Sequence, residues 1–362
     1  MVIDLFGLTA EESAEMYPSL YQHVLIHDKP ERDLNNRDFY RKNWWIFGEP
    51  RRELRPAIAG LHRYIATIET SKHRFFTFLD KEILPDNKLI AIASNDGHVM
   101  GLLSSVVHVT WSLAAGSWLG VGNNSVYVKT RCFEPFPFPV IKEGELRQRI
   151  RDLGERIDAH RKHQQGLHPD ITLTGIYNVL QKLRTGEALD AKEKAIHDKG
   201  LVSMLKRFHD DLDAIVLEAY GWTDLASAIP LSDILARGGP DAEALEQQLL
   251  TRLVALNHER AAEEARGLIR WLRPDFQAPR TAITQQAEIV LADDNTTPDT
   301  APPIILDWPA ELPAQVAAVR KLLPSIGHDP QALAACFGRK SKKRSEHITA
   351  ILDTLKSLGH II

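Results

Sequence analysis

The spacing of hydrophobic residues divides the chain into zones of different periodicity. In the first 140 residues, β-branched and aromatic runs lie between turn signals and predict strands, at RYIATIE (63–69), KLIAIAS (88–94) and SVYVKT (125–130). Beyond residue 143 the apolar positions repeat at helical spacing, as in Leu146, Ile150, Leu153 and Ile157. We therefore expect a mixed α/β domain over residues 1–140 and a mainly α-helical domain over 141–275.

The C-terminal part divides again. Residues 276–308 are rich in Thr, Asp, Ala and Pro, a composition typical of a linker. Residues 309–362 predict three helices, over 314–323, 330–337 and 345–358, in the order of a small helix-turn-helix or winged-helix module. The basic turn of this module would supply auxiliary contacts to a DNA backbone, through Arg339, Lys340, Lys342, Lys343 and Arg344. The alternative is a three-helix cap whose lysines are merely solvated.

Charge, cysteine content and hydropathy limit the kinds of protein that this chain can be. The 362 residues carry a formal net charge of -4, so a polyanionic partner must meet local basic patches. Only Cys132 and Cys336 are present, and their separation suits neither a disulfide framework nor a structural metal site. No apolar run approaches membrane-spanning length and no signal peptide is evident. We expect a cytoplasmic, nucleoid-associated bacterial protein that binds no metal and no membrane.

Cations are concentrated among aromatic residues between residues 26 and 74. Guanidinium groups pair bidentately with phosphate, so this composition favours contact with a nucleic-acid backbone. Trp44 and Trp45 are expected in the core, because large aromatic side chains are usually buried.

The segment 118–139, WLGVGNNSVYVKTRCFEPFPFP, combines turns, amides, cations and aromatics. The amides of Asn123 and Asn124 can engage adenine bidentately, and Lys129 and Arg131 can donate to guanine or phosphate. Ser125 and Tyr127 lie between them as further candidates. The phenylalanines of FEPFPFP would anchor the far end in the core. On the residues alone, an ordinary Asn-rich hairpin turn remains the alternative.

Several stretches, taken in order, resemble a known family: DLFGL, YPSLYQHVL, KPERDLNNRDFYRKNWWIFGEPRRELR, RYIATIETSKHRFFTFLD, LLSSVVHVTW and LGVGNNSVYVKTRCFEPFPFP. They are similar to the target-recognition half of class I adenine DNA methyltransferases that depend on S-adenosylmethionine, as found in type IIG and type IIL restriction-modification enzymes and phage-defence systems. The resemblance is dense in the first zone and weaker toward the C-terminus.

The resemblance implies a division of labour between two domains. An upstream methyltransferase domain binds S-adenosylmethionine and flips adenine, while the region represented by this chain recognises the sequence of double-stranded DNA. This chain contains no Asn-Pro-Pro-Tyr or Asp-Pro-Pro-Tyr motif, the signature with which such enzymes grip the flipped base. We therefore expect no catalytic residue and no cofactor site here. The glycine-rich LGVGN loop lacks the preceding strand and following acid of a cofactor loop.

A second set of candidates lies near predicted strand ends, where hydroxyls and cations commonly position phosphates: Lys72, His73, Arg74, Ser104, Ser105 and His108. Many relatives in the resembled family carry a basic residue where Val106 stands. The chain is therefore expected to make one fewer backbone contact or to read a different base. The two histidines have a structural alternative.

Two other functions remain open. Asp170, Asp190 and Lys192 formally match the loose pattern of a metal-dependent nuclease. However, Asp190 and Glu193 have the spacing of a helix capping box, whereas the nuclease residues belong on a strand. The other alternative is a non-catalytic scaffold whose helical zone docks a methyltransferase partner.

Overall fold

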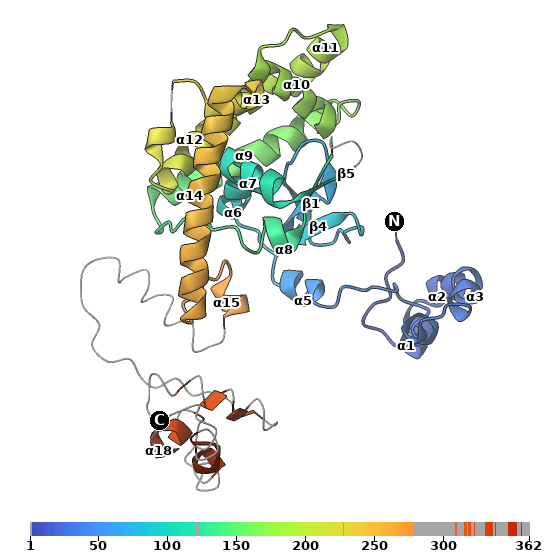
Figure 1. Cartoon of the computed structure of the whole chain (residues 1–362). Helices are drawn as coiled ribbons and strands as arrows, with labels where there is room; N and C mark the ends of the chain where they lie inside the picture. The colour runs from blue at the N-terminus through green and yellow to red at the C-terminus, as the bar shows by residue number, and fades with distance from the viewer. Residues whose placement is uncertain are drawn as a thin grey trace. The chain divides into compact units, whose positions relative to one another are not determined.

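The computed structural model describes residues 2–119, 124–226 and 228–278 and, beyond them, 308–309, 315–316, 318–319, 322, 330–335, 337, 347–352 and 356. The chain forms two compact units, Met1–Val290 and Leu291–Ile362. Figure 1 labels many of their elements.

The first unit begins with five short helices: α1 (Ala10–Met16), α2 (Pro18–His27), α3 (Lys29–Asp33), α4 (Asp38–Lys42) and α5 (Leu54–Ala59). Cations and aromatics in this region contact each other: Arg32 and Arg37 lie over the ring of Tyr40, at 5.1 and 5.5 Å from its centroid. As predicted, Trp44 is buried. Part of the cation and aromatic pattern read as phosphate-binding is therefore engaged in local contacts between its own side chains.

Two small antiparallel sheets follow. The first has the order β3-β1-β4, from Thr77–Asp80, Arg63–Ile68 and Leu89–Ile92. The second has the order β2-β6-β5, from Thr70–Ser71, Asn124–Val126 and Ser117–Leu119. Three predicted strand runs thus form β1, β4 and β6, although β6 ends at Val126 and Lys129 begins a helix.

The run LLSSVVHVTW is helical, which corrects the expectation that Ser104, Ser105 and His108 lie near strand ends. It belongs to α6 (Gly97–Ser104) and α7 (Val106–Ala115), whose N-caps are Asp96 and Ser105. All eight residues of α6 are buried. A helix that is apolar on every side shows no amphipathic period, so its sequence resembles that of a buried strand.

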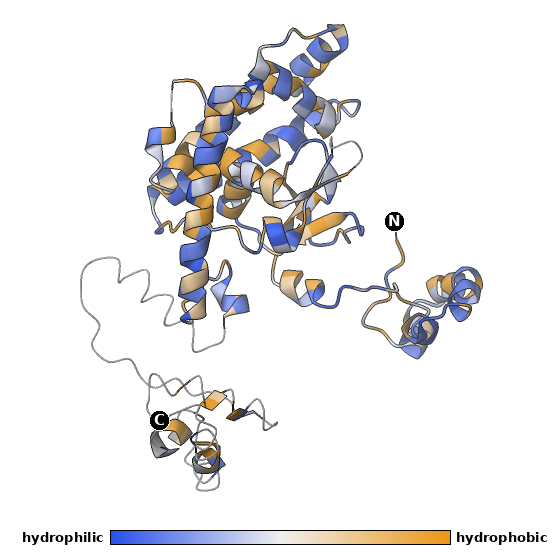
Figure 2. Cartoon of the chain, viewed as in Figure 1, coloured by the Kyte–Doolittle hydropathy of each residue, from blue (hydrophilic) through white to orange (hydrophobic). Residues whose placement is uncertain are grey.

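The long helix α9 (Glu145–Leu167) packs against α6 and α12. Its buried residues include Ile150, Leu153 and Ile157, as the spacing predicted. Around it lie α8 (Lys129–Cys132), α10 (Leu173–Thr185), α11 (Ala191–Gly200), α12 (Val202–Ala219), η1 (Thr223–Leu225), α13 (Leu231–Arg237), α14 (Pro240–Ala265) and α15 (Pro274–Gln277). Figure 2 shows polar and apolar residues mixed along α14, which buries Leu249 and Leu253.

One hydrophobic cluster joins the two zones that the sequence separates at residue 140. Phe75, Val107 and Phe136 come from the first zone, and Ile157 and Leu212 come from the helices. A smaller cluster lies against the first sheet and includes Ile65, Phe78 and Tyr127. The first unit therefore has a main core that links the two zones and a second, smaller core against the first sheet.

The second unit has a core of its own, with Val319, Leu333, Phe337, Ile348 and Leu352 buried. Among its described residues, α18 (Pro330–Ala335) lies within the second predicted helix, and helical residues also occur within the other two predicted ranges. The basic turn, with Arg339, Lys340, Lys342, Lys343 and Arg344, lies outside the described residues.

Among the described residues, no single helix has both the length and the apolar character needed to cross a membrane, and only the bent pair α6 and α7 meets that test jointly.

Candidate nucleic-acid interface

The sheet β2-β6-β5 and the short helix α8 carry most of the candidates from the segment 118–139. Ser125 on β6 pairs with Ser71 on one side and with Trp118 on the other. Two residues after β6, the chain turns into α8. Asn124, Ser125, Tyr127, Lys129 and Arg131 therefore lie close together along one strand-to-helix connection. Asn123 lies outside the described residues.

Arg74 connects the two sheets from inside the molecule. Only 7% of it is exposed. Its guanidinium donates to the carbonyl oxygens of Ile68, Glu69 and Ser125 and to the hydroxyls of Thr67 and Ser125. It also lies 5.1 Å from the ring centroid of Tyr127. In this conformation Arg74 and Ser125 hold the ends of the strands together and do not face solvent, which departs from their predicted contact with DNA.

His108 and Tyr127 form a second buried contact beneath the segment. The Tyr127 hydroxyl lies 3.2 Å from His108 Nε2, and the two ring nitrogens lie 3.0 and 3.3 Å from the carbonyl oxygens of Leu103 and Cys132. Burial lowers the pKa of His108 to about 4 and raises the pKa of Tyr127 above its ordinary value. Both groups are therefore neutral near pH 7 and serve the scaffold.

Ser104 and Ser105 are also enclosed. Ser105 is fully buried, caps α7 and donates from its hydroxyl to the Leu102 carbonyl at 2.7 Å. Ser104 is 7% exposed, and its hydroxyl has no hydrogen-bond partner in the described part of the chain. Neither side chain reaches a surface that a duplex could approach, so their predicted contact with phosphate does not agree with their burial. Val106 follows them at the start of α7, half-buried, with its amide bonded to Asp213.

Lys129 and Arg131 are exposed on α8. Within the part of the chain that the structure describes, neither side chain forms an ion pair or hydrogen bond. Glu134, the acidic residue nearest to them in sequence, contacts Lys129 only through a hydrogen bond between backbone groups. Asn124 is half-buried on β6. The strand-to-helix connection therefore presents two free cations, and Asn124 lies at the partly exposed end of β6.

Lys72 and His73 lie at the turn between β2 and β3. The Lys72 ammonium donates to Asn178 Oδ1 on α10, and His73 Nε2 lies 2.8 Å from the same oxygen. Burial lowers the pKa of His73. Lys72 remains exposed, so it is the member of the second candidate set that reaches solvent as a cation.

The FEPFPFP end is anchored as predicted. Phe136 is 4% exposed and packs edge-on against His108 and Phe138. The Tyr220 hydroxyl donates to the Pro137 carbonyl at 3.0 Å, and the Asn257 amide donates to the Pro135 carbonyl. The helical zone thereby fixes the C-terminal side of the candidate segment.

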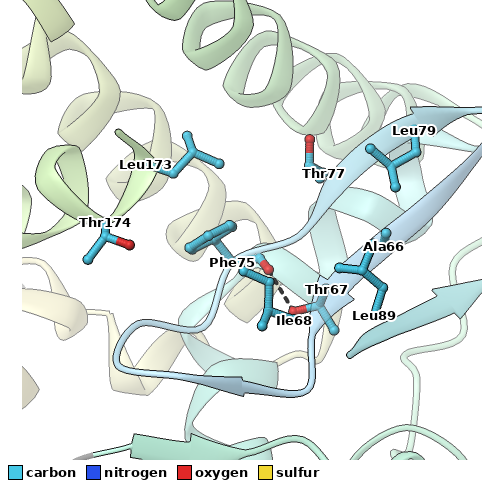
Figure 3. A pocket seen from close by; sticks show the side chains of 9 residues that line it. All are labelled: Ala66, Thr67, Ile68, Phe75, Thr77, Leu79, Leu89, Leu173 and Thr174. Atoms are coloured by element: carbon cyan, nitrogen blue, oxygen red, sulfur yellow. Dashed lines mark hydrogen bonds between the residues drawn. The ribbon is translucent and has the colours of Figure 1, made fainter. Parts of the chain in front are cut away.

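An apolar pocket of about 350 Å³ lies between the first sheet and α10. Figure 3 shows Phe75 and Leu173 on its wall, with the Thr67 hydroxyl bonded to the Phe75 carbonyl. Its lining contains no titratable residue, the polar side chains being Thr67, Thr77 and Thr174. S-adenosylmethionine carries an ammonium, a carboxylate and ribose hydroxyls, which need charged and acidic partners. The pocket does not fit that cofactor.

A buried polar network lies under the sheet, and no sequence pattern predicted it. Arg161, 2% exposed, donates to the Tyr177 hydroxyl and the Phe76 carbonyl. Tyr177 lies 3.0 Å from His209, and Asp158 accepts from Thr77. The partners come from four separate elements, so no local spacing links them. The polar residues on the otherwise apolar faces of α9 and α12 were the available signal.

The three residues of the nuclease pattern do not converge. Asp170 is exposed and pairs with Lys199 at 2.6 Å. Asp190 caps α11 and forms the predicted capping box with Glu193, whereas Lys192 is exposed on the same helix. Across the described residues, no group of three or more His, Cys, Asp or Glu side chains could hold a metal ion. The geometry does not assemble a nuclease site.

Comparison with known proteins gives little beyond this geometry. No protein-family model and no curated protein matches the chain. A solved structure of the type IIL restriction-modification enzyme MmeI in complex with DNA is 18% identical, with a TM-score of 0.44, over 68% of this chain and 28% of that chain. MmeI is of a class that the sequence resembles. A TM-score below 0.5 does not establish a shared fold, and the DNA belongs to that complex.

Proposed function

We propose that this chain binds double-stranded DNA and reads its sequence, as the target-recognition part of an adenine-N6 DNA methyltransferase of a restriction-modification or phage-defence system. The observation that carries the proposal is the pair of exposed cations, Lys129 and Arg131, without acidic partners among the described residues. They occur on a segment that the resemblance to that family places in the sequence-reading region.

The proposed contacts follow from chemistry. Lys129 and Arg131 donate to phosphates or to guanine, and Asn124 offers an amide that suits adenine. Lys72 adds a cation at the neighbouring turn. Arg74, Ser125, His108 and Tyr127 hold these groups from below, because their own polar atoms are bonded inside the protein. A fixed backbone under exposed donors favours specific recognition, since fewer conformations must be frozen on binding.

Methyl transfer would come from a separate methyltransferase domain or subunit, which would bind S-adenosylmethionine and flip the adenine. The described residues supply no base-gripping motif, and their apolar pocket does not suit the cofactor. This chain would therefore position the catalytic partner on its target sequence.

The test is binding of the full chain to a randomised duplex DNA pool at two salt concentrations, with sequencing of the bound fraction. Enrichment of a short motif, lost in Arg131→Ala, supports a sequence reader. Each of Lys129→Ala and Arg131→Ala should lower the slope of log K against log salt by about one if the cation meets a phosphate.

Lys194→Ala is the matched control, because Lys194 is exposed on α11 and likewise forms no ion pair among the described residues. It should leave affinity and enrichment unchanged. Binding without enrichment would limit the chain to backbone affinity, and absence of binding would reject the proposal in favour of a docking scaffold.

A further inference from the structure

Trp118 differs from the other tryptophans of the described chain. Half of it is exposed, whereas Trp44 and Trp111 are 9% and 8% exposed. Trp222 stacks on Tyr220 with ring centroids 4.5 Å apart, and the indole of Trp45 donates to the Leu8 carbonyl. Among the described residues, no hydrogen bond or ring contact engages the Trp118 side chain. Exposing a large indole forgoes the stabilisation that its burial would give.

The backbone of Trp118 is nevertheless held in place. β5 pairs with β6, where Trp118 lies opposite Ser125. Arg74 bonds both the carbonyl and the hydroxyl of Ser125. Of the described strands, only β6 pairs with β5, so β5 forms an edge of the sheet. The indole thus extends from a supported edge strand, and the neighbouring Leu119 is 53% exposed.

Positive charge lies close to the same strand. A Cβ on Gly116 would be 3.4 Å from the sulfur of Cys132, and that thiol lies 3.5 Å from the Ser112 carbonyl. Gly116 is two residues from Trp118, and Cys132 is adjacent to Arg131 in sequence. The exposed indole and the free guanidinium are therefore attached near one buried contact, between Gly116, which directly precedes β5, and Cys132 of α8.

We propose that Trp118 stacks on a base of the bound DNA, entering the duplex as an apolar wedge while Lys129 and Arg131 hold adjacent phosphates. This inference rests on the proposed function. An aromatic ring stacks on any base face, and apolar side chains inserted at a base step unstack and kink the duplex. The neighbouring cations favour DNA over a second protein chain, because they complement a phosphate backbone.

The experiment measures affinity of the full chain for the duplex enriched from the random pool, or for the labelled pool itself where no motif emerges. Trp118→Ala should weaken binding by about 5- to 150-fold, the range for loss of one stacked base. Trp118→Phe, which keeps an aromatic ring, should recover much of that loss. Phe276→Ala is the matched control, because Phe276 is an aromatic residue with 49% exposure, and it should bind as the wild type does.

Tryptophan fluorescence supplies a second readout. Stacking should quench the emission of the wild-type chain on DNA addition, and the quenching should be largely absent from Trp118→Phe. DNA binding that is unchanged in Trp118→Ala would overturn the wedge and leave the proposed function intact. If Trp118→Ala binds DNA as the wild type does but no longer self-associates, β5 would instead be assigned to a contact between two copies of the chain. A wild-type chain that binds no duplex would overturn both proposals.

Discussion

Gly154 on α9 meets Gly97 on α6 with no space for a side chain between them. A Cβ on Gly154 would collide with the Gly97 carbonyl oxygen and lie 2.8 Å from the backbone nitrogen of Gly101. The two helices therefore touch through their backbones. We predict that Gly154→Ala lowers the free energy of unfolding by about 1 to 3 kcal/mol, because overpacking outweighs the gain in helix propensity.

The control lies on the same helix. Gly166 has no atom within 4 Å of an added Cβ. Gly166→Ala should leave stability unchanged or raise it by up to about 1 kcal/mol. Urea denaturation of both variants gives the comparison, and equal effects would contradict a close backbone contact.

Arg74 should behave as a scaffold residue. Arg74→Ala removes five buried or half-buried hydrogen bonds from a charged donor, so we expect a loss of about 3 kcal/mol or more in unfolding free energy. The Thr67 and Ser125 hydroxyls and the Glu69 carbonyl would keep their other partners. The unfolding free energy of Arg74→Lys should lie between those of the wild type and Arg74→Ala, because one ammonium cannot reproduce the guanidinium geometry. Lys129→Ala should instead weaken DNA binding and leave stability within about 0.5 kcal/mol of wild type. Thermal melts measure stability, and fluorescence anisotropy measures binding. Arg74→Ala that melts like the wild type would refute the scaffold role.

Asp213 should make stability depend on pH. Burial raises the pKa of its carboxyl to about 7, one oxygen accepts from the Val106 amide at 2.7 Å, and the other has no hydrogen-bond partner among the described residues. In the unfolded chain an aspartate titrates near about 3.9. Between these values the folded state binds the proton and the unfolded state does not, so this group's stabilising contribution decreases as pH rises from about 4 to 7.

Asp213→Asn should remove that decrease. Denaturation midpoints at pH 5 and pH 8 measure this change. The stability of the variant relative to the wild type should be higher at pH 8 than at pH 5. His108 acts in the opposite direction, since its pKa of about 4 costs stability as pH falls below about 6.5. A wild-type profile and an Asp213→Asn profile that run parallel would show that the carboxyl is ionised in the folded chain.

Substitutions of Asp190 distinguish a role as helix cap from a role as metal ligand of a nuclease. Asp190→Ala should cost about 0.5 to 2 kcal/mol by removing the capping box, and Asp190→Asn should retain most of the stability because asparagine also caps helices. A metal-dependent cleavage assay with Mg²⁺ should show no activity in any of the three chains. Cleavage by the wild type that both variants abolish would restore the nuclease alternative.

The sequence predicted those elements whose pattern is local. The face of α9 with Ile150 and Leu153 follows from helical spacing, and the Asp190 cap follows from a four-residue motif. By contrast, the break between α11 and α12 falls at Leu201, whose φ of 44° is a conformation that periodicity does not reveal.

The candidate site was harder to predict, because exposure depends on distant residues. Arg74 and Lys129 are both cations beside strand residues, and only the fold shows that one is enclosed by carbonyl oxygens while the other is free. Likewise, Ser105 and His108 have the composition of a phosphate-binding turn, yet both are fully buried. The sequence thus indicated a segment that carries exposed cations, but not which of its side chains reach the surface.

Arg74 binds mostly to backbone carbonyl oxygens, and such acceptors are present whatever side chains the neighbouring positions carry. The ends of β1 and β6 are consequently joined in a way that tolerates change at the outward positions of the strand-to-helix connection. The exposed Lys129 and Arg131 can be exchanged for other residues at little cost to folding, so variants at these two positions would change the proposed DNA contact on an unchanged support.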